Sequence, residues 1–261
     1  MQEKRVNHIL ITGASSGIGE ALALHYAVPG RLLSLLGRNS ERTEAVASLC
    51  RAKGARVSAI SLDVQDATAM EAWVRDRDHE QSLDLVIANA GVSAGSGGSG
   101  ESAEQTRQIF SINVNGIFNT VLPTIELMRA RQRGQIAIMS SIAGFRGLPS
   151  APAYCASKAA VKVWGEGLRG QLAREHIGVS VICPGFVVSG ISRRNRFPMP
   201  FLMQTDAAAL LIAKGIDANR GRIAFPWPMA FMAWIMTTLP ERLIGAITSR
   251  LQHKETLPEQ P

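Results

Sequence analysis

The chain has 261 residues, of which 46% are hydrophobic and 19% charged, and its formal net charge is +7 at pH 7. This length is sufficient for one full core, and the composition excludes a disordered or fibrous chain. No apolar run is long enough to cross a bilayer, and the three cysteines lack the number and spacing of a disulfide framework or a metal site. We therefore expect a globular protein of a reducing, cytoplasmic compartment. The arginines are spread over many segments without a nucleic-acid motif, so the basic charge does not indicate nucleic-acid binding.

Apolar β-type runs alternate with longer helical patterns along the chain. The predicted strands are residues 8–12, 31–36, 56–62, 83–88, 135–140, 179–183 and 222–225. The predicted helices are residues 17–28, 40–53, 66–79, 103–131, 152–175 and 206–218. Continuous apolar strands between helices are typical of a parallel sheet that is covered on both faces. The pattern predicts an α/β fold with a doubly wound parallel sheet, without a break between two domains.

A glycine-rich turn, residues 12–19 with the sequence TGASSGIG, directly follows the first predicted strand and opens the first predicted helix. Its three glycines allow the backbone to turn tightly and to approach a pyrophosphate. The N-terminus of the following helix presents free N–H groups and a partial positive charge, to which the serine hydroxyls add hydrogen bonds. This position in the chain predicts a dinucleotide-binding site.

Tyr154 and Lys158 lie four residues apart in the predicted helix 152–175, so their side chains share one face. A nearby ammonium favours the phenolate, and we expect it to lower the pKa of Tyr154 from about 10 toward neutral pH. A tyrosine of that kind donates or accepts a proton at a carbonyl or hydroxyl. The spacing alone does not establish this role, because tyrosine and lysine are common on helices.

The turn at 12–19 and the downstream Tyr154–Lys158 spacing resemble the short-chain dehydrogenase/reductase family, in its compact single-domain branch. Further segments resemble the motifs of that family in the same order, over residues 8–225: Asn89-Ala90-Gly91, Ile112-Asn113-Val114, Ser140 to Gly144, and Pro184 to Ser189. Two positions depart from the pattern, since Ala88 replaces an asparagine and Ser189 a threonine. The resemblance implies a Rossmann-type fold in which residues 1–261 form one NAD(P)-binding domain, with a substrate loop at 189–205 and an apolar C-terminal tail at 226–261.

The resemblance also implies four catalytic residues. Tyr154 would transfer the proton, Ser141 would polarise the carbonyl, Lys158 would bind the nicotinamide ribose and lower the pKa of Tyr154, and Asn113 would anchor a water that leads to solvent. The implied cofactor-binding residues are Gly13, Ser15, Ser16, Gly17, Ile18, Gly19, Arg38, Asp63, Val64, Asn89, Ala90, Gly91, Tyr154, Lys158, Pro184, Gly185, Val187 and Ser189. No metal is implied.

The end of the second predicted strand bears on the choice of cofactor. An acidic residue there would bind the ribose 2′-hydroxyl of NAD, but Gly37 occupies the position at which the NAD-preferring members carry aspartate. Arg38 follows, and a guanidinium is well suited to the 2′-phosphate of NADP. We expect NADP(H) to be preferred, with NAD(H) as the alternative cofactor.

Two segments bear on the substrate and on partners. Residues 190–203 combine three arginines with large apolar side chains, which predicts either a lid over an apolar substrate with an anionic end or a solvated basic turn. The tail from residue 226 is rich in tryptophan and methionine, and it would cover the pocket, pack against another subunit or contact a membrane surface. We favour the first two uses. The resemblance suggests a homodimer or homotetramer that forms through the helices beginning near Ala103 and Pro152.

Together these features predict an NADP(H)-dependent oxidoreductase that interconverts a ketone or aldehyde and an alcohol. Its partner would be a small, apolar or lipid-like substrate, with Tyr154 as proton donor and acceptor during hydride transfer. One alternative is a 3-oxoacyl thioester reductase, whose basic surface would bind an acyl carrier. Another is a catalytically silent nucleotide-binding scaffold. We expect a cytoplasmic location, with peripheral membrane association through the tail as the alternative.

Overall fold

The computed structural model describes residues 6–93, 100–189, 192, 199–240 and 242–244. Its strands are β1 (His8–Thr12), β2 (Leu32–Gly37), β3 (Arg56–Ser61), β4 (Leu85–Ala88), β5 (Gly134–Met139), β6 (Ile177–Pro184) and β7 (Arg222–Phe225). They form a seven-stranded sheet in the order β3-β2-β1-β4-β5-β6-β7, in which every neighbouring pair is parallel. The α/β fold predicted from the sequence is therefore confirmed.

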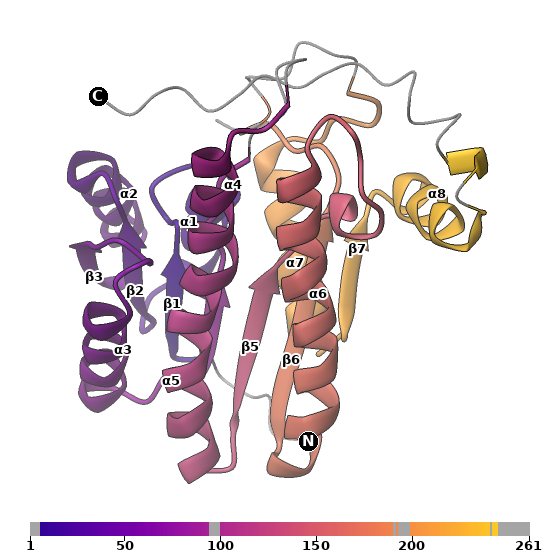
Figure 1. The fold of residues 1–261 in the computed structure, drawn as a ribbon. Helices are drawn as coiled ribbons and strands as arrows, with labels where there is room; N and C mark the ends of the chain where they lie inside the picture. The colour runs from indigo at the N-terminus through magenta and orange to yellow at the C-terminus, as the bar shows by residue number, and fades with distance from the viewer. Residues whose placement is uncertain (1–5, 94–99, 190–191, 193–198, 241, 245–261) are drawn as a thin grey trace.

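Helices cover both faces of this sheet (Figure 1). They are α1 (Gly17–Tyr26), α2 (Ser40–Ala52), α3 (Ala67–Glu80), α4 (Ala103–Phe110), α5 (Gly116–Ala130), α6 (Pro152–Leu172), α7 (Thr205–Asp217) and α8 (Trp227–Thr238). One face carries α1, α2 and α7, and the other carries α3, α5 and α6. This arrangement is the Rossmann-type, doubly wound architecture.

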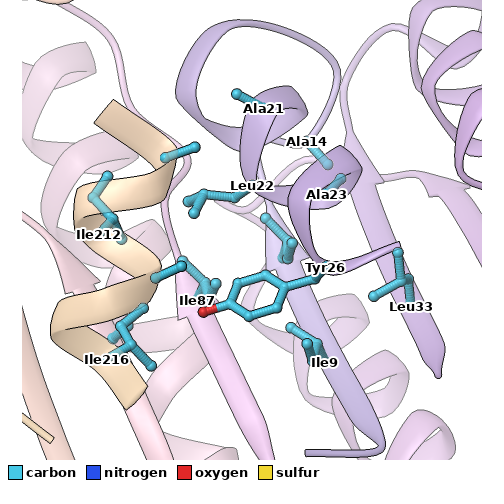
Figure 2. Close-up of a cluster of buried hydrophobic side chains, with 14 of the residues drawn as sticks. Ile9, Ala14, Ala21, Leu22, Ala23, Tyr26, Leu33, Ile87, Ile212 and Ile216 are labelled. Carbon is cyan, nitrogen blue, oxygen red and sulfur yellow. The ribbon is translucent and has the colours of Figure 1, made fainter. Parts of the chain in front are cut away.

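Alternate residues of each strand point to opposite faces, which gives the protein two hydrophobic layers. In β1, Ile9 and Ile11 belong to the layer under α1 and α7, whereas Leu10 belongs to the layer under α3 and α5. Figure 2 shows the first layer, in which Tyr26 of α1 and Ile216 of α7 meet above the strands. Each fully buried aliphatic side chain of this kind stabilises the fold by roughly 1.5–3 kcal/mol.

The predicted helix at 103–131 is interrupted in the structure. It consists of α4, a π-helical segment at Ser111–Asn115, and α5. π-Helical turns are rare and occur frequently at functional sites. The interruption falls on the segment that contains Asn113, a residue that the sequence motifs single out.

Helix α8 was not predicted from the sequence, which yielded only an apolar tail. Its low amphipathicity explains the omission, because apolar side chains surround the helix and no polar face marks the 3.6-residue period. Pro228 lies in its first turn, where proline is well tolerated. The helix lies beside β7, the edge strand of the sheet (Figure 1). No helix within the described ranges is both long and apolar enough to span a membrane.

Candidate active site

A cavity of about 940 Å³ lies where the turns after β1, β4, β5 and β6 meet. In a parallel sheet these turns share the carboxyl edge, which is where ligands bind in open α/β folds. Among the residues predicted from the sequence, those that line the cavity are Gly13, Ser15, Ser16, Gly17, Ile18, Gly19, Arg38, Val64, Asn89, Ala90, Gly91, Ser141, Tyr154, Lys158, Pro184, Gly185, Val187 and Ser189. Two predicted residues, Asn113 and Asp63, are not part of the lining.

The glycine-rich turn after β1 is held against the β4 turn. The side-chain amide of Asn89 donates to the carbonyl oxygens of Thr12 (3.0 Å) and Gly13 (3.2 Å), and the Thr12 hydroxyl accepts from the backbone N–H of Asn89 (3.0 Å). A Cβ at residue 19 would lie 2.2 Å from the Gly13 carbonyl oxygen and 2.6 Å from the Asn89 amide nitrogen. The backbone cannot move aside as a flexible side chain can. Residue 19 must therefore be glycine for α1 to approach the turn this closely.

The hydroxyl of Ser141 lies at the end of β5, where Ser141 caps the short 3₁₀ helix Ile142–Gly144. Its oxygen accepts from the backbone N–H of Ala143 (3.1 Å), and its hydroxyl lies within 3.4 Å of the Pro184 carbonyl oxygen, to which it donates. It is also close enough to Tyr154 for hydrogen bonding to lower the pKa of that tyrosine. The two hydroxyls predicted to act on the substrate are thus brought together on the cavity wall.

Lys158 is almost fully buried, at 3% exposure, and its position is fixed from two sides. The Lys158 ammonium donates to the Met139 carbonyl oxygen (3.0 Å), and the Ser140 hydroxyl donates to the Lys158 carbonyl oxygen (2.8 Å). These bonds tie α6 to the end of β5. Burial lowers the pKa of Lys158 from 10.5 to about 8, because an apolar environment disfavours the ammonium form.

The prediction that the pKa of Tyr154 is lowered is wrong. The pKa of Tyr154 is raised to about 12, mainly because burial disfavours the phenolate, and the Ser141 hydrogen bond lowers it only in part. The Lys158 ammonium lies 5.9 Å from the centroid of the tyrosine ring and is engaged by Met139. The i, i+4 spacing correctly predicted a shared face, but it could not reveal how strongly both groups are desolvated.

Asn113 lies behind the cavity wall and is fully buried. Its side chain accepts from the backbone N–H of Val92 (2.8 Å), and donates to the Val92 carbonyl oxygen (2.9 Å) and to the Ser157 hydroxyl (3.0 Å). Ser157 in turn donates to the Tyr154 carbonyl oxygen (2.8 Å). A Cβ built on Gly91 would lie 3.1 Å from Asn113 Oδ1 and 3.2 Å from Lys158 Nζ, so both groups lie close to the same side of Gly91.

Ser157 was missed by the motif reasoning, and Ser140 entered it only as the first residue of the Ser140 to Gly144 motif. Their hydroxyls help to position three of the predicted catalytic residues: Ser157 bonds Asn113 and Tyr154, and Ser140 bonds the backbone of Lys158.

At the other end of the cavity, Arg38 and Arg42 both line the wall and are exposed. Asn39 caps α2 by accepting from the backbone N–H of Arg42 (2.8 Å), which places Arg42 in the first turn of that helix and Arg38 directly before the cap. A Cβ at residue 37 would lie 2.4 Å from the Thr43 hydroxyl. The surroundings of Gly37 therefore leave no room for an acidic side chain at this position. Arg42 was missed by the sequence reasoning, although its spacing of four residues from Arg38 was a usable signal.

Asp63, which the family resemblance implies as a cofactor-binding residue, does not line the cavity, and its contact with the cofactor stays a prediction. Its carboxylate accepts from the backbone N–H and from the side-chain amide of Gln65, both at 3.0 Å. The neighbouring Val64 does line the cavity.

The remaining wall of the cavity is mostly apolar. It includes residues from the turns after β5 and β6 and three residues of α8: Ile142, Leu148, Phe186, Met229, Ala233 and Met236, with Arg146 as a cation on the same wall. In the predicted substrate loop, residues 190–191 and 193–198, with the three arginines, lie outside the described residues. In the tail, residues 241 and 245–261 do so as well.

Comparisons with known proteins agree with this architecture. The sequence model of the short chain dehydrogenase family matches residues 7–198. A protein described as an uncharacterized oxidoreductase from Myxococcus xanthus is 39% identical over 253 residues, which cover 97% of this chain and 100% of that protein. Oxidoreductase UcpA from Salmonella typhimurium is 31% identical over 257 residues, which cover 96% of this chain and 94% of that protein.

Solved structures resemble the fold along most of its length. A 3-ketoacyl-ACP reductase from Sinorhizobium meliloti is 27% identical with a TM-score of 0.75, and the match covers 86% of this chain and 99% of that one. A short-chain dehydrogenase from Sphingobium yanoikuyae, solved in complex with NADPH, has a TM-score of 0.80 at 24% identity, with 97% and 100% covered. Because the family model spans most of the sequence and the relatives align along nearly their whole length, this chain belongs to the short-chain dehydrogenase/reductase family of NAD(P)-dependent oxidoreductases.

Proposed function

We propose that the protein is an NADP(H)-dependent oxidoreductase that interconverts a ketone or aldehyde and an alcohol, on an apolar or lipid-like substrate. One observation carries the proposal: Tyr154 and Ser141 line the same cavity as the glycine-rich turn, and Ser141 is close enough to lower the pKa of Tyr154 by hydrogen bonding. A carbonyl oxygen that reaches this pair would meet two hydroxyl donors beside a dinucleotide site. Residues 1–261 would serve this function as one domain, with the substrate loop at 189–205 and the tail at 226–261.

The residues of the cavity fit a dinucleotide. Gly13, Gly17 and Gly19 keep side chains away from the turn at the N-terminus of α1, where phosphates are favoured by free N–H groups. Lys158 lines the far end with an ammonium that can donate more hydrogen bonds than the one that Met139 accepts. A nicotinamide cofactor supplies the hydride when it is bound.

The chain itself would position the substrate and move the proton. With a pKa near 12, Tyr154 is protonated at neutral pH and can donate to a carbonyl oxygen as that oxygen gains charge. Ser141 would stabilise the same oxygen by a second hydrogen bond. Lys158 would bind the ribose and stabilise the phenolate once the tyrosine has given up its proton. Asn113, in the π-helical segment behind Gly91, would hold a water on the route by which that proton is replaced.

The preference for NADP(H) is supported by Arg38 and Arg42 and tested by replacing each with alanine. A guanidinium bound to a phosphate stabilises the complex by a charge-assisted hydrogen bond, so each change should raise the Kd for NADPH by about tenfold or more. The Kd for NADH should stay the same, because NADH lacks the 2′-phosphate. The measurement is cofactor titration followed by protein fluorescence, with Arg133→Ala as an exposed control before β5, at the opposite edge of the sheet. Equal losses for both cofactors would contradict the phosphate-binding role.

The function is tested with a panel of carbonyl substrates and NADPH absorbance. The panel contains medium- and long-chain ketones, ring ketones, aldehydes and a 3-oxoacyl thioester. Turnover of free ketones supports the proposal, whereas turnover of the thioester alone favours the alternative, a 3-oxoacyl thioester reductase. The 27% identity to a 3-ketoacyl-ACP reductase supports this alternative. A protein that binds NADPH but turns over none of these is the nucleotide-binding scaffold.

We further propose a homodimer or homotetramer that forms through α4, α5 and α6. Leu122 on α5 and Val163 on α6 are 51% and 61% exposed, and such apolar side chains on neighbouring helices suit a subunit interface. Replacing both with aspartate should lower the mass measured by light scattering to that of a smaller assembly, because buried like charges oppose association. An unchanged mass would exclude this face as the subunit interface.

The cytoplasmic location remains a prediction. Peripheral membrane contact remains the alternative use of the outer side of α8, where Trp227, Phe231 and Trp234 are exposed. Flotation with anionic liposomes at low salt tests that alternative, and protein that does not float with the liposomes removes it.

A further inference from the structure

Helix α8 presents one apolar side to the cavity. Met229, Ala233 and Met236 line the cavity, and their i, i+4, i+7 spacing places them on the same side of the helix. The helix contains no charged residue, so this wall offers only apolar contacts to whatever occupies the cavity. We call this side the inner face of α8.

The inner face begins beside the polar pair formed by Ser141 and Tyr154. A Cβ built on Gly185 would lie 3.1 Å from the sulfur of Met229 and 3.4 Å from the Cδ1 atom of Ile142. Gly185 directly follows Pro184, whose carbonyl oxygen accepts from Ser141. At a rise of 1.5 Å per residue, the helix extends for about 10 Å from Met229 to Met236. The wall is therefore long enough to contact a substrate well beyond its reacting carbonyl.

The three side chains differ in what they permit. Methionine is unbranched and adapts to irregular apolar shapes, so Met229 and Met236 can follow many ligands. Ala233 is the smallest of the three and lies one helical turn from each methionine. A larger side chain at residue 233 would therefore extend into the part of the cavity that lies between the two methionines.

We propose that the inner face of α8, centred on Ala233, binds the apolar body of the carbonyl substrate and sets the largest body that the site accepts. The substrate class is then a ketone or aldehyde with a chain or ring that extends from the carbonyl to Ala233. This inference rests on the proposed function, and it assigns substrate selection to a helix outside the substrate loop at 189–205.

The main test is Ala233→Phe, assayed with NADPH and two ketones, 2-butanone and 2-undecanone. The phenyl ring should fill the space that the long chain needs. We expect kcat/KM for 2-undecanone to fall about tenfold or more relative to that for 2-butanone, a size of effect that apolar pockets commonly produce. The Kd for NADPH should not change, because α8 lies beside the edge strand β7, whereas Arg38 follows β2 near the opposite edge of the sheet (Figure 1).

The matched control is Thr238→Phe. Thr238 lies on the side of α8 opposite the inner face and is exposed, so the same ring there adds volume outside the cavity. Its ratio of kcat/KM values for the two ketones should equal that of the wild type. A second variant, Met236→Ala, enlarges the cavity and should shift the ratio toward the longer ketone. This variant keeps the inference testable if Ala233→Phe does not fold.

A binding measurement separates this inference from the proposed function. The neutral apolar dye Nile red is titrated into the protein with saturating NADP⁺, and 2-undecanone is used to displace it. Ala233→Phe should weaken the displaceable dye binding, and Thr238→Phe should not. If no ketone is turned over but the dye still responds in this way, the proposed function fails and the role of α8 stands. If Ala233→Phe changes neither dye binding nor the ketone ratio, the role of α8 is overturned.

Discussion

Tyr154→Phe should abolish most of the carbonyl-dependent oxidation of NADPH while leaving NADPH binding intact. The change removes one hydroxyl and keeps the ring, so packing on α6 is preserved. A positioned general acid contributes about 10²- to 10⁴-fold to the rate, and kcat should fall by a factor in this range. The Ser141 hydroxyl stays in place through its bonds to Pro184 and Ala143, so the carbonyl still finds one donor and a small residual rate is expected.

The chain offers a matched control for this variant in Tyr26. Tyr26 is buried between α1 and α7, and its hydroxyl lacks a hydrogen-bond partner among the described residues (Figure 2). Tyr26→Phe makes the same chemical change far from the cavity and should leave turnover unchanged. Steady-state assays and cofactor titrations on both variants provide the comparison. A Tyr154→Phe enzyme with wild-type kcat would rule out Tyr154 as the proton donor.

Ser141→Ala should also weaken the stabilisation of the carbonyl oxygen of the substrate, but by removing a hydrogen bond and not the proton donor. Loss of this hydroxyl removes a partner that lowers the pKa of Tyr154, and it removes the second donor to the substrate. The double variant should then be little worse than Tyr154→Phe alone, because groups that act as one unit have non-additive effects on kcat.

The sequence predicted the parts of this site that lie at strand ends. The turn at 12–19, Asn89, Ser141 and Pro184 follow predicted strands, and parallel strands bring their carboxyl ends to one edge. Their proximity therefore followed from the order of the elements, without any knowledge of side-chain contacts. The same argument placed Tyr154 and Lys158 on one face of α6, because helical periodicity fixes that relation.

What the sequence could not predict depends on burial and on contacts between distant segments. The raised pKa of Tyr154 and the lowered pKa of Lys158 both arise mainly from desolvation, which spacing does not report. Helix α8 escaped prediction because it is apolar on every side: one side lines the cavity and the opposite side is exposed. An amphipathic pattern requires a polar side, and this helix has none.

The buried Lys158 should also lower the free energy of unfolding, by an amount that depends on pH. Its pKa is about 8 in the folded protein and near 10.5 when the chain is unfolded. Below pH 8 both states carry the proton, and the folded state bears the full penalty of a buried charge. Between about pH 8 and 10.5 the unfolded state binds more protons than the folded state, so the free energy of unfolding rises with pH and the penalty disappears.

Lys158→Met should therefore make the cofactor-free protein more stable at pH 7. A fall in the pKa from 10.5 to about 8 corresponds to roughly 3 kcal/mol, at about 1.4 kcal/mol for each tenfold change in proton affinity. The lost hydrogen bond to Met139 offsets about 1 kcal/mol, which leaves a gain of about 2 kcal/mol. This gain should shrink as the pH rises from 8 toward 10.

The measurement is urea unfolding of both proteins at several pH values, and the quantity that matters is the difference between them. Other buried groups that both proteins share and that do not interact with Lys158, such as Tyr26 and Cys50 with their raised pKa values, cancel in that difference. Lys214→Met, at an exposed position on α7, is the control and should show no such pH-dependent gain. A Lys158→Met protein that is less stable at pH 7, or whose gain does not vary with pH, would contradict the buried-charge account.

The same variant links the penalty to the function. NADPH should stabilise the wild type more than Lys158→Met, because the ribose would add hydrogen-bond acceptors for the buried ammonium to the Met139 carbonyl oxygen that it already binds. Turnover should be lost together with this extra stabilisation, since Lys158 would no longer stabilise the phenolate of Tyr154. A variant that gains stability while it loses cofactor binding and turnover would identify Lys158 as a residue kept for chemistry at the expense of folding. Equal stabilisation of both proteins by NADPH would instead assign the buried lysine a role without cofactor contact.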